Sequence, residues 1–188
     1  MTTRLALLEA AQKACCRRGY DGFSYSDLAK DVGIRKPSIH HHFPTKADLI
    51  EALIAQYSDD FFSHLSDISQ HAKPAGVQLW QYLDRYRDQL AGGSQLCLCV
   101  ALSMNPDKLT DSCVDALNGF HAKSVKWLSG VFQLAERDGS ITQIDRPQLE
   151  AIATLALVKG AQILSRAAGD ITPYDVSVRR LSKRLLQV

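Results

Sequence analysis

Basic, hydroxyl and imidazole side chains gather in one short segment of the first quarter of the chain. Arg35 and Lys36 begin it, Ser38 and the histidines at 40–42 follow, and Lys46 comes last. Guanidinium and ammonium groups donate hydrogen bonds to phosphates and guanine, and short polar side chains reach other base edges. The residue types therefore indicate contact with a nucleic acid, with Lys46 as a candidate phosphate ligand.

Three consecutive histidines could instead suggest a metal site. Successive helical residues point about 100° apart, whereas helical metal ligands pair at positions i and i+4. The imidazoles of His40, His41 and His42 therefore cannot converge on one ion, and we expect them to face DNA or to pack on a turn. No other metal-ligand spacing, Ser/His/Asp set or carboxylate pair stands out. The sequence predicts no metal, no cofactor and no enzyme.

Two short helices joined by a glycine must position these side chains. Ser24 and Asp27 have the spacing of a capping box, which predicts a helix over 25–32 that stops at Gly33. A second short helix is predicted over 36–42. Short helices joined by such a turn form a helix-turn-helix, in which the first lies across the DNA backbone and the second enters the major groove.

The periodicity of the second short helix separates a packed side from an outward side. Ile39 and Phe43 fall on the inward side, whereas Pro37, Ser38 and His41 fall on the other. The alternative is an ordinary solvated helix. The residues predicted to contact DNA are Ser24, Tyr25, Arg35, Lys36, Pro37, Ser38, His40, His41 and Lys46.

The rest of the chain also has helical periodicity, with breaks at Gly, Pro or Asn. The first helix ends at Gly19, a capping box at Thr45 and Asp48 begins a long helix, and 71–76 is a linker. An all-α fold of about nine helices is predicted. Its later helices are predicted at 76–91, 95–104, 111–137, 147–168 and 173–187.

One set of residue types at fixed spacing runs through residues 3–55: Ala10-Ala11, Gly19-Tyr20, Ser24-x-x-Asp27-Leu28-Ala29, Val32-Gly33-Ile34 and Ser38-Ile39-His40-His41-His42-Phe43-x-x-Lys46-x-x-Leu49. This set resembles the DNA-binding domain of the TetR family. The resemblance implies a homodimeric repressor of double-stranded operator DNA, released when a small molecule binds its C-terminal helices. It implies a DNA-binding domain over 1–60 and an effector-binding, dimerising domain over 61–188.

Two positions depart from the family pattern. His40 stands where members usually carry a Tyr that touches the DNA backbone. A histidine side chain reaches less far than tyrosine and can be protonated, so its contact with DNA would be sensitive to pH. Arg35 replaces a small capping residue. The operator sequence therefore cannot be inferred from the resemblance.

The segment Leu96-Cys97-Leu98-Cys99-Val100 is similar to a Gly-Cys-Leu-x-Val segment of NemR-like regulators, which sense electrophiles through cysteine. Cys97 matches the sensing cysteine, and we expect it in the first turn of a helix, where its thiol pKa would fall. The alternative is a buried, small apolar residue. Five cysteines without a secretory signal predict no disulfide framework.

The effector pocket is inferred from the family resemblance. Two apolar helix faces are candidates for its wall, and the alternative is that both are ordinary bundle core. The first comprises Leu79, Trp80, Leu83 and Tyr86, and the second Phe120, Trp127 and Leu128.

The last two long helices carry a broad apolar surface, which predicts dimerisation through them. The alternative is that this surface faces only its own domain. Its residues are Leu149, Ile152, Ala153, Ala156, Leu157, Gly160, Ala161, Leu164, Val176, Leu181, Leu185 and Leu186.

Charge and apolar patterning complete the expectations. The formal net charge is +2, yet the first 50 residues hold eight Lys or Arg and five Asp or Glu. The longest uninterrupted apolar run, 96–102, is too short to span a bilayer. We therefore expect a cytoplasmic protein without a membrane partner. A regulator controlled by a protein partner alone, without an effector, is the alternative function.

Overall fold

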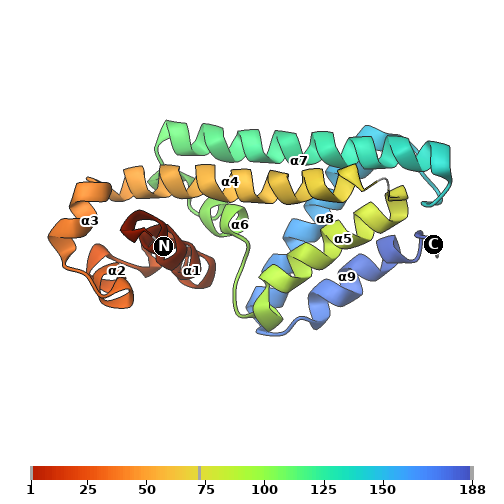
Figure 1. Ribbon diagram of the computed structural model, residues 1–188. Coiled ribbons are helices and arrows are strands. Elements are labelled where there is room, and N and C mark those ends of the chain that lie inside the picture. The colour runs from red at the N-terminus through yellow and green to blue at the C-terminus, as the bar shows by residue number, and fades with distance from the viewer. Residues whose placement is uncertain (1, 72, 187–188) are drawn as a thin grey trace. The chain divides into compact units, whose positions relative to one another are not determined.

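The computed structural model describes residues 2–71 and 73–186. Its nine α-helices confirm the predicted all-α fold (Figure 1). Three short 3₁₀ helices, η1 (Tyr20–Gly22), η2 (Ala91–Gly93) and η3 (Pro106–Lys108), lie between them. The α-helices are α1 (Thr3–Arg18), α2 (Tyr25–Val32), α3 (Lys36–His42), α4 (Lys46–Gln70), α5 (Ala75–Gln89), α6 (Leu98–Ser103), α7 (Asp111–Asp138), α8 (Pro147–Ala168) and α9 (Thr172–Ser182).

Two predicted helices are too long. The helix predicted at 95–104 begins only at Leu98, because Gly92 and Gly93 adopt positive φ of 70° and 95° and the chain is extended at Cys97. The last helix ends at Ser182 rather than at 187, and residue 187 lies outside the described residues.

The chain after α9 pairs with the segment that precedes α8. Leu185 forms an antiparallel bridge with Ile141, and the backbone N–H of Thr142 donates to the carbonyl of Arg184 at 2.9 Å. The Arg184 side chain contacts the carboxylate of Glu150 at 2.8 Å. Extended pairing thus satisfies backbone groups that a longer helix would have satisfied internally.

The helices divide into two compact units. The first comprises residues 1–59 and 97–119, and the second comprises 60–96 and 120–188. Helices α4 and α7 contribute to both units. Residues 97–119 therefore pack with the N-terminal helices, which sequence periodicity did not indicate. The functional division at residue 60 stays a prediction.

The first unit is built around α1, which packs against α2 and α6. Burial of apolar side chains in this unit stabilises the short helices α2 and α3, because helices of this length are unstable alone. Its fully buried apolar side chains include Leu7, Leu8, Ala11, Cys15, Leu28, Ile39, Leu49, Ile50 and Leu53.

An aromatic cluster occupies the core of the second unit. Phe61 lies at its centre, with ring centroids 5.0 Å from Phe120, 5.5 Å from Tyr86 and 6.4 Å from Tyr82. Trp127 stacks on Tyr82 at 5.5 Å with only 20° between the ring planes. These rings join α4, α5 and α7 into one core.

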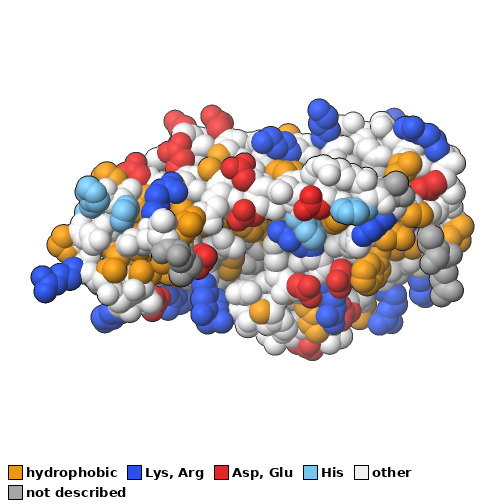
Figure 2. All heavy atoms as spheres, viewed as in Figure 1, with side chains coloured by type: hydrophobic (Ala, Val, Ile, Leu, Met, Phe, Trp, Pro, Cys, Tyr) orange, Lys and Arg blue, Asp and Glu red, His pale blue; other side chains and the backbone are white. Residues whose placement is uncertain are grey.

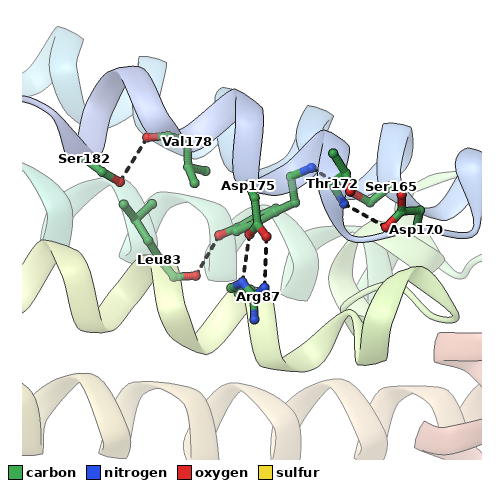
Figure 3. A network of polar contacts seen from close by, with 9 residues as sticks. Leu83, Arg87, Ser165, Asp170, Thr172, Asp175, Val178 and Ser182 are labelled. Carbon is green, nitrogen blue, oxygen red and sulfur yellow. Dashed lines mark hydrogen bonds and ion pairs between the residues drawn. The ribbon is translucent and has the colours of Figure 1, made fainter.

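Helix α9 is joined to α5 and α8 by polar contacts (Figure 3). Arg87 donates two hydrogen bonds to Asp175, at 2.7 and 2.9 Å, which lowers the pKa of that carboxyl. The hydroxyl of Tyr174 donates to the carbonyl of Leu83 at 2.7 Å. These contacts align α9 along the second unit.

Helix α8 is apolar on more than one face. It is long and apolar enough to cross a membrane, by length and composition alone. Residues such as Leu155, Val158 and Ala161 nevertheless lie in the core of the second unit. It is therefore a partly buried core helix.

Candidate nucleic-acid interface

The predicted capping box at the start of α2 is present. The backbone N–H of Ser24 donates to Asp27 at 2.8 Å, and the backbone N–H of Asp27 donates back to the Ser24 hydroxyl at 3.3 Å. Hydrogen bonds from Ser24 lower the pKa of the Asp27 carboxyl. Ser24 is exposed but already engaged, so its first role is to fix where α2 begins.

Gly33 ends α2 in the left-handed conformation, with φ 74° and ψ 33°. The next residue, Ile34, donates its backbone N–H to the carbonyl of Ala29 at 3.0 Å. Positive φ at this position disfavours residues with a Cβ, so the tight turn into α3 depends on glycine. The stop predicted at Gly33 is confirmed.

Helix α3 has the two sides that its sequence predicts. Ile39 and Phe43 are buried, with exposed fractions of 0% and 2%. The opposite side is exposed or half-buried, and Figure 2 shows histidine, Lys and Arg side chains gathered over this end of the first unit. This outward side comprises Arg35, Lys36, Pro37, Ser38, His40 and His41.

His40 has a fixed orientation at the end of α3. Its Nδ1 lies 3.1 Å from the carbonyl oxygen of Pro44, and its ring lies edge-to-face with Tyr25 at 4.9 Å. Because a carbonyl only accepts, Nδ1 must carry a hydrogen. In the neutral ring Nε2 is therefore an acceptor.

Tyr25 lies inside the unit, so the structure does not support its predicted position on the DNA-contacting surface. Its side chain is 8% exposed, and its hydroxyl lies 2.9 Å from the carbonyl oxygen of Phe43 and 2.5 Å from that of Thr45. Burial raises the pKa of Tyr25 to about 12, which keeps the hydroxyl protonated as a donor. We assign Tyr25 a positioning role: it holds the turn between α3 and α4.

Removing this hydroxyl should loosen that turn. We expect Tyr25→Phe to lower the free energy of unfolding by about 1–2 kcal/mol, because a buried hydrogen bond is lost and carbonyl groups lose a donor. Urea unfolding followed by circular dichroism measures the change. Tyr20→Phe is the matched control, since no hydrogen bond of the Tyr20 hydroxyl is found among the described residues. Equal stability of Tyr25→Phe and wild type would contradict the role.

Lys46 is half-buried and makes contacts within the first unit. Its ammonium donates to the carbonyl of Phe23 at 2.7 Å and lies over the rings of Phe23 and Tyr20, 4.2 and 4.6 Å from their centroids. Burial lowers the pKa of Lys46. The side chain therefore joins the start of α4 to the segment before α2, and its contact with a phosphate stays a prediction.

Cys97 is the N-cap of α6, one residue before the first turn that the sequence predicted for it, and it is only 2% exposed. Burial is the larger cause of the raised pKa of the Cys16 thiol in α1, and Cys97 also contributes to raising it. Burial raises the pKa values of Cys15 and Cys16 to about 12, so these thiols are not activated. All five cysteines are free thiols.

The residues predicted for an effector pocket lie in the second unit, apart from Cys97. Leu79, Leu83, Tyr86 and Phe120 are buried at 0–4% exposure, and Trp127 is half-buried. Trp80 is 52% exposed, because consecutive helical residues point about 100° apart and Leu79 takes the inward position. The sequence prediction missed Tyr82, which the same helical spacing places beside Leu79 and Tyr86.

One face of α8 forms an exposed apolar stripe, which we call the α8 stripe. Its large members are Leu149, Ile152, Ile163 and Leu164, with exposed fractions of 39–59%. Small residues at 153, 156 and 160 lie between them at helical spacing. Ala161 and Leu181, two other members of the predicted dimer surface, instead lie in the core of the second unit.

Comparison with known proteins agrees with this architecture. Residues 7–53 match the family of bacterial regulatory proteins, tetR family. The chain is 30% identical over 76 residues to the HTH-type transcriptional regulator TtgR of Pseudomonas putida, covering 39% of this chain and 36% of TtgR. The chain thus spans about a third of the length of that relative.

Whole-chain similarity comes from solved structures. A TetR-family regulator from Agrobacterium tumefaciens superposes with a TM-score of 0.90 at 27% identity, covering 98% of this chain and 97% of that one. Reduced NemR from E. coli has a TM-score of 0.84 at 20% identity, covering 99% and 98%, which shows a shared fold. Residues 7–53 thus match the TetR family of bacterial regulators, and the described residues have the all-α TetR fold with an N-terminal helix-turn-helix.

Proposed function

We propose that this protein is a repressor that inserts α3 into the major groove of operator DNA. The observation that carries the proposal is the two-sided α3, with Ile39 and Phe43 buried and a basic, polar side turned outward. Such a helix can enter a groove while its apolar side holds it to the unit.

We propose a smaller set of DNA-contacting residues than the sequence predicted. We assign base and phosphate contacts to residues on the outward side of α3, with Ser24 at the start of α2 as a further backbone contact. Tyr25 and Lys46 position this surface from inside the unit. The proposed contact residues are Ser24, Arg35, Lys36, Pro37, Ser38, His40 and His41.

The proposed repressor is a homodimer formed through α8 and α9. The α8 stripe supports this, because a face with apolar residues at 39–59% exposure is costly in water and can cover itself in a two-fold pair. Val176 of α9 is also apolar and 54% exposed. Two copies of α3 could then read two half-sites about one DNA turn apart.

The proposed signal is a small molecule that binds the second unit and releases the DNA. The aromatic cluster around Phe61 supports it, since rigid aromatic walls are common in small-molecule sites. Control by a protein partner alone is the alternative. A cytoplasmic location is part of the proposal, because the operator is there.

Selection from a random double-stranded DNA library tests the core of this proposal. The purified full chain should enrich a sequence with two-fold symmetry, and the enriched duplex should bind in a gel-shift titration. Enrichment of no sequence would contradict operator recognition. Failure of a panel of small molecules to release the bound duplex would favour a protein partner instead.

Electrophile sensing by Cys97 is a second form of the signal. Its place at the N-cap of α6 favours it, because helix N-termini stabilise thiolates, whereas its burial opposes it. We expect N-ethylmaleimide to release wild-type protein from the operator and to leave Cys97→Ser bound. Cys113→Ser, at another buried free cysteine, is the control. Equal release of Cys97→Ser and wild type would exclude Cys97 as the sensor.

A further inference from the structure

A groove of about 660 Å³ opens between α4, α5 and α7 in the second unit. Its volume lies within the range of about 300–1,000 Å³ that is typical of small-molecule sites. Most of its wall is apolar, with Ser69 and Gln78 as polar points. The apolar side chains are Phe62, Trp127, Val131 and Leu134.

The wall of the groove is held in place before any ligand binds. The indole N–H of Trp127 donates to the hydroxyl oxygen of Ser69 at 3.0 Å, and the indole stacks on Tyr82. The amide nitrogen of Gln78 donates to the carbonyl of Lys73 at 2.8 Å. A wall fixed in this way loses little conformational entropy when it receives a ligand.

The charge of the groove is positive. Lys123 and Lys126 line it one helical turn apart, and no carboxylate among the described residues lines it. The ammonium of Lys123 lies 5.7 Å from the centre of the Phe62 ring, so charge and apolar wall are adjacent. Among the described residues, neither lysine belongs to an ion pair. Figure 2 shows Lys and Arg side chains along the edge formed by the second half of α7.

One position in the wall of the groove carries no side chain. Gly130 lines it within α7, and a Cβ added there would meet no atom within 4 Å. Glycine lowers helix stability relative to alanine or leucine, so the stability of α7 does not explain why position 130 is a glycine. The missing side chain leaves room next to Trp127 and Val131.

We propose that this groove binds a hydrophobic organic anion. A carboxylate or sulfonate would lie between Lys123 and Lys126, and a ring-sized apolar body would lie against Phe62 and Trp127. The claim that this anion is the effector rests on the proposed function. The claim that the groove binds such an anion rests only on the residues that line the groove.

Two matched probes separate charge from apolar contact: anilinonaphthalene sulfonate and its uncharged counterpart phenylnaphthylamine. The chain has two tryptophans, so Trp80→Phe leaves Trp127 as the single reporter. We expect both probes to quench Trp127 in the full-length protein. Absence of quenching by both probes would overturn the proposal.

Variants of the groove test each part of the proposal in this background. Lys123→Gln with Lys126→Gln should weaken sulfonate binding about three- to tenfold and leave phenylnaphthylamine unchanged, as expected for two exposed charges. Gly130→Leu should weaken both probes at least about tenfold while keeping the helix intact. Gly119→Leu, at an equally open position of α7 in the first unit, should change neither.

Several results would overturn the site. Unchanged sulfonate binding in the double lysine variant would show that the two lysines do not bind the anion. Unchanged binding of both probes in Gly130→Leu would show that the probes bind outside the groove. A change of oligomeric state in Gly130→Leu, measured by sedimentation, would show that a second copy covers it. If the sulfonate binds as expected but leaves operator DNA bound, the site stands and its effector role fails.

Discussion

Replacing Arg35 and Lys36 together by glutamine should weaken operator binding at least about tenfold at 0.1 M salt. Both side chains are exposed at the start of α3, where the outward side of that helix begins. Each lost phosphate contact reduces the slope of log affinity against log salt by about 0.9. A dimer loses up to four contacts, so the slope should become shallower by roughly two to four. Gel-shift titrations at several salt concentrations measure both quantities.

The control carries the same change in charge elsewhere. Lys123→Gln with Lys126→Gln removes two exposed lysines from the second unit and should leave the salt slope unchanged in the absence of ligand. Equal salt slopes for the Arg35 and Lys36 variant and for wild type would show that these two residues do not contact DNA phosphates. A slope lowered equally in both variants would indicate a general effect of net charge rather than contact by α3.

Charge placed on the α8 stripe should separate the dimer. Ile152→Glu with Leu164→Glu puts carboxylates on apolar positions that are 48% and 59% exposed in the single chain. In a two-fold interface each substitution is buried twice, and a buried unpaired charge costs several kcal/mol. The dimer dissociation constant should therefore rise at least about 100-fold. Sedimentation velocity over a range of protein concentrations measures it.

Operator affinity should fall with the dimer, because one copy reads only one half-site. Met104→Glu is the control, since Met104 is apolar and 56% exposed but lies in the first unit. It should leave both the dimer and the operator affinity unchanged. Dimers that persist in the Ile152 and Leu164 variant would contradict the assignment and place the interface elsewhere.

Much of the helix-turn-helix could be predicted because its signals are local. The capping boxes at Ser24 and Thr45 and the left-handed Gly33 each involve residues within a few positions of one another. Helical periodicity likewise separated Ile39 and Phe43 from the outward side of α3. Such features depend on the backbone of one turn, so they can be identified without knowledge of the fold.

The direction of individual side chains was harder to predict, because their partners lie far along the chain. The hydroxyl of Tyr25 hydrogen-bonds to the backbone carbonyls of Phe43 and Thr45, and the ammonium of Lys46 hydrogen-bonds to that of Phe23. Both residues have types suited to DNA contact, yet packing turns them inward. Conversely, Arg35 and Lys36 are exposed, as their residue types and their place at the start of α3 predicted.

By itself, the sequence determined an all-α chain with a helix-turn-helix near its N-terminus, because caps, glycines and apolar spacing act within single helices. Only the tertiary structure decided which residues share a unit. It placed residues 97–119 with the N-terminal helices, buried Cys97, and brought Phe62, Lys123 and Trp127 to one groove. These outcomes depend on packing between distant helices, which spacing along one helix does not specify.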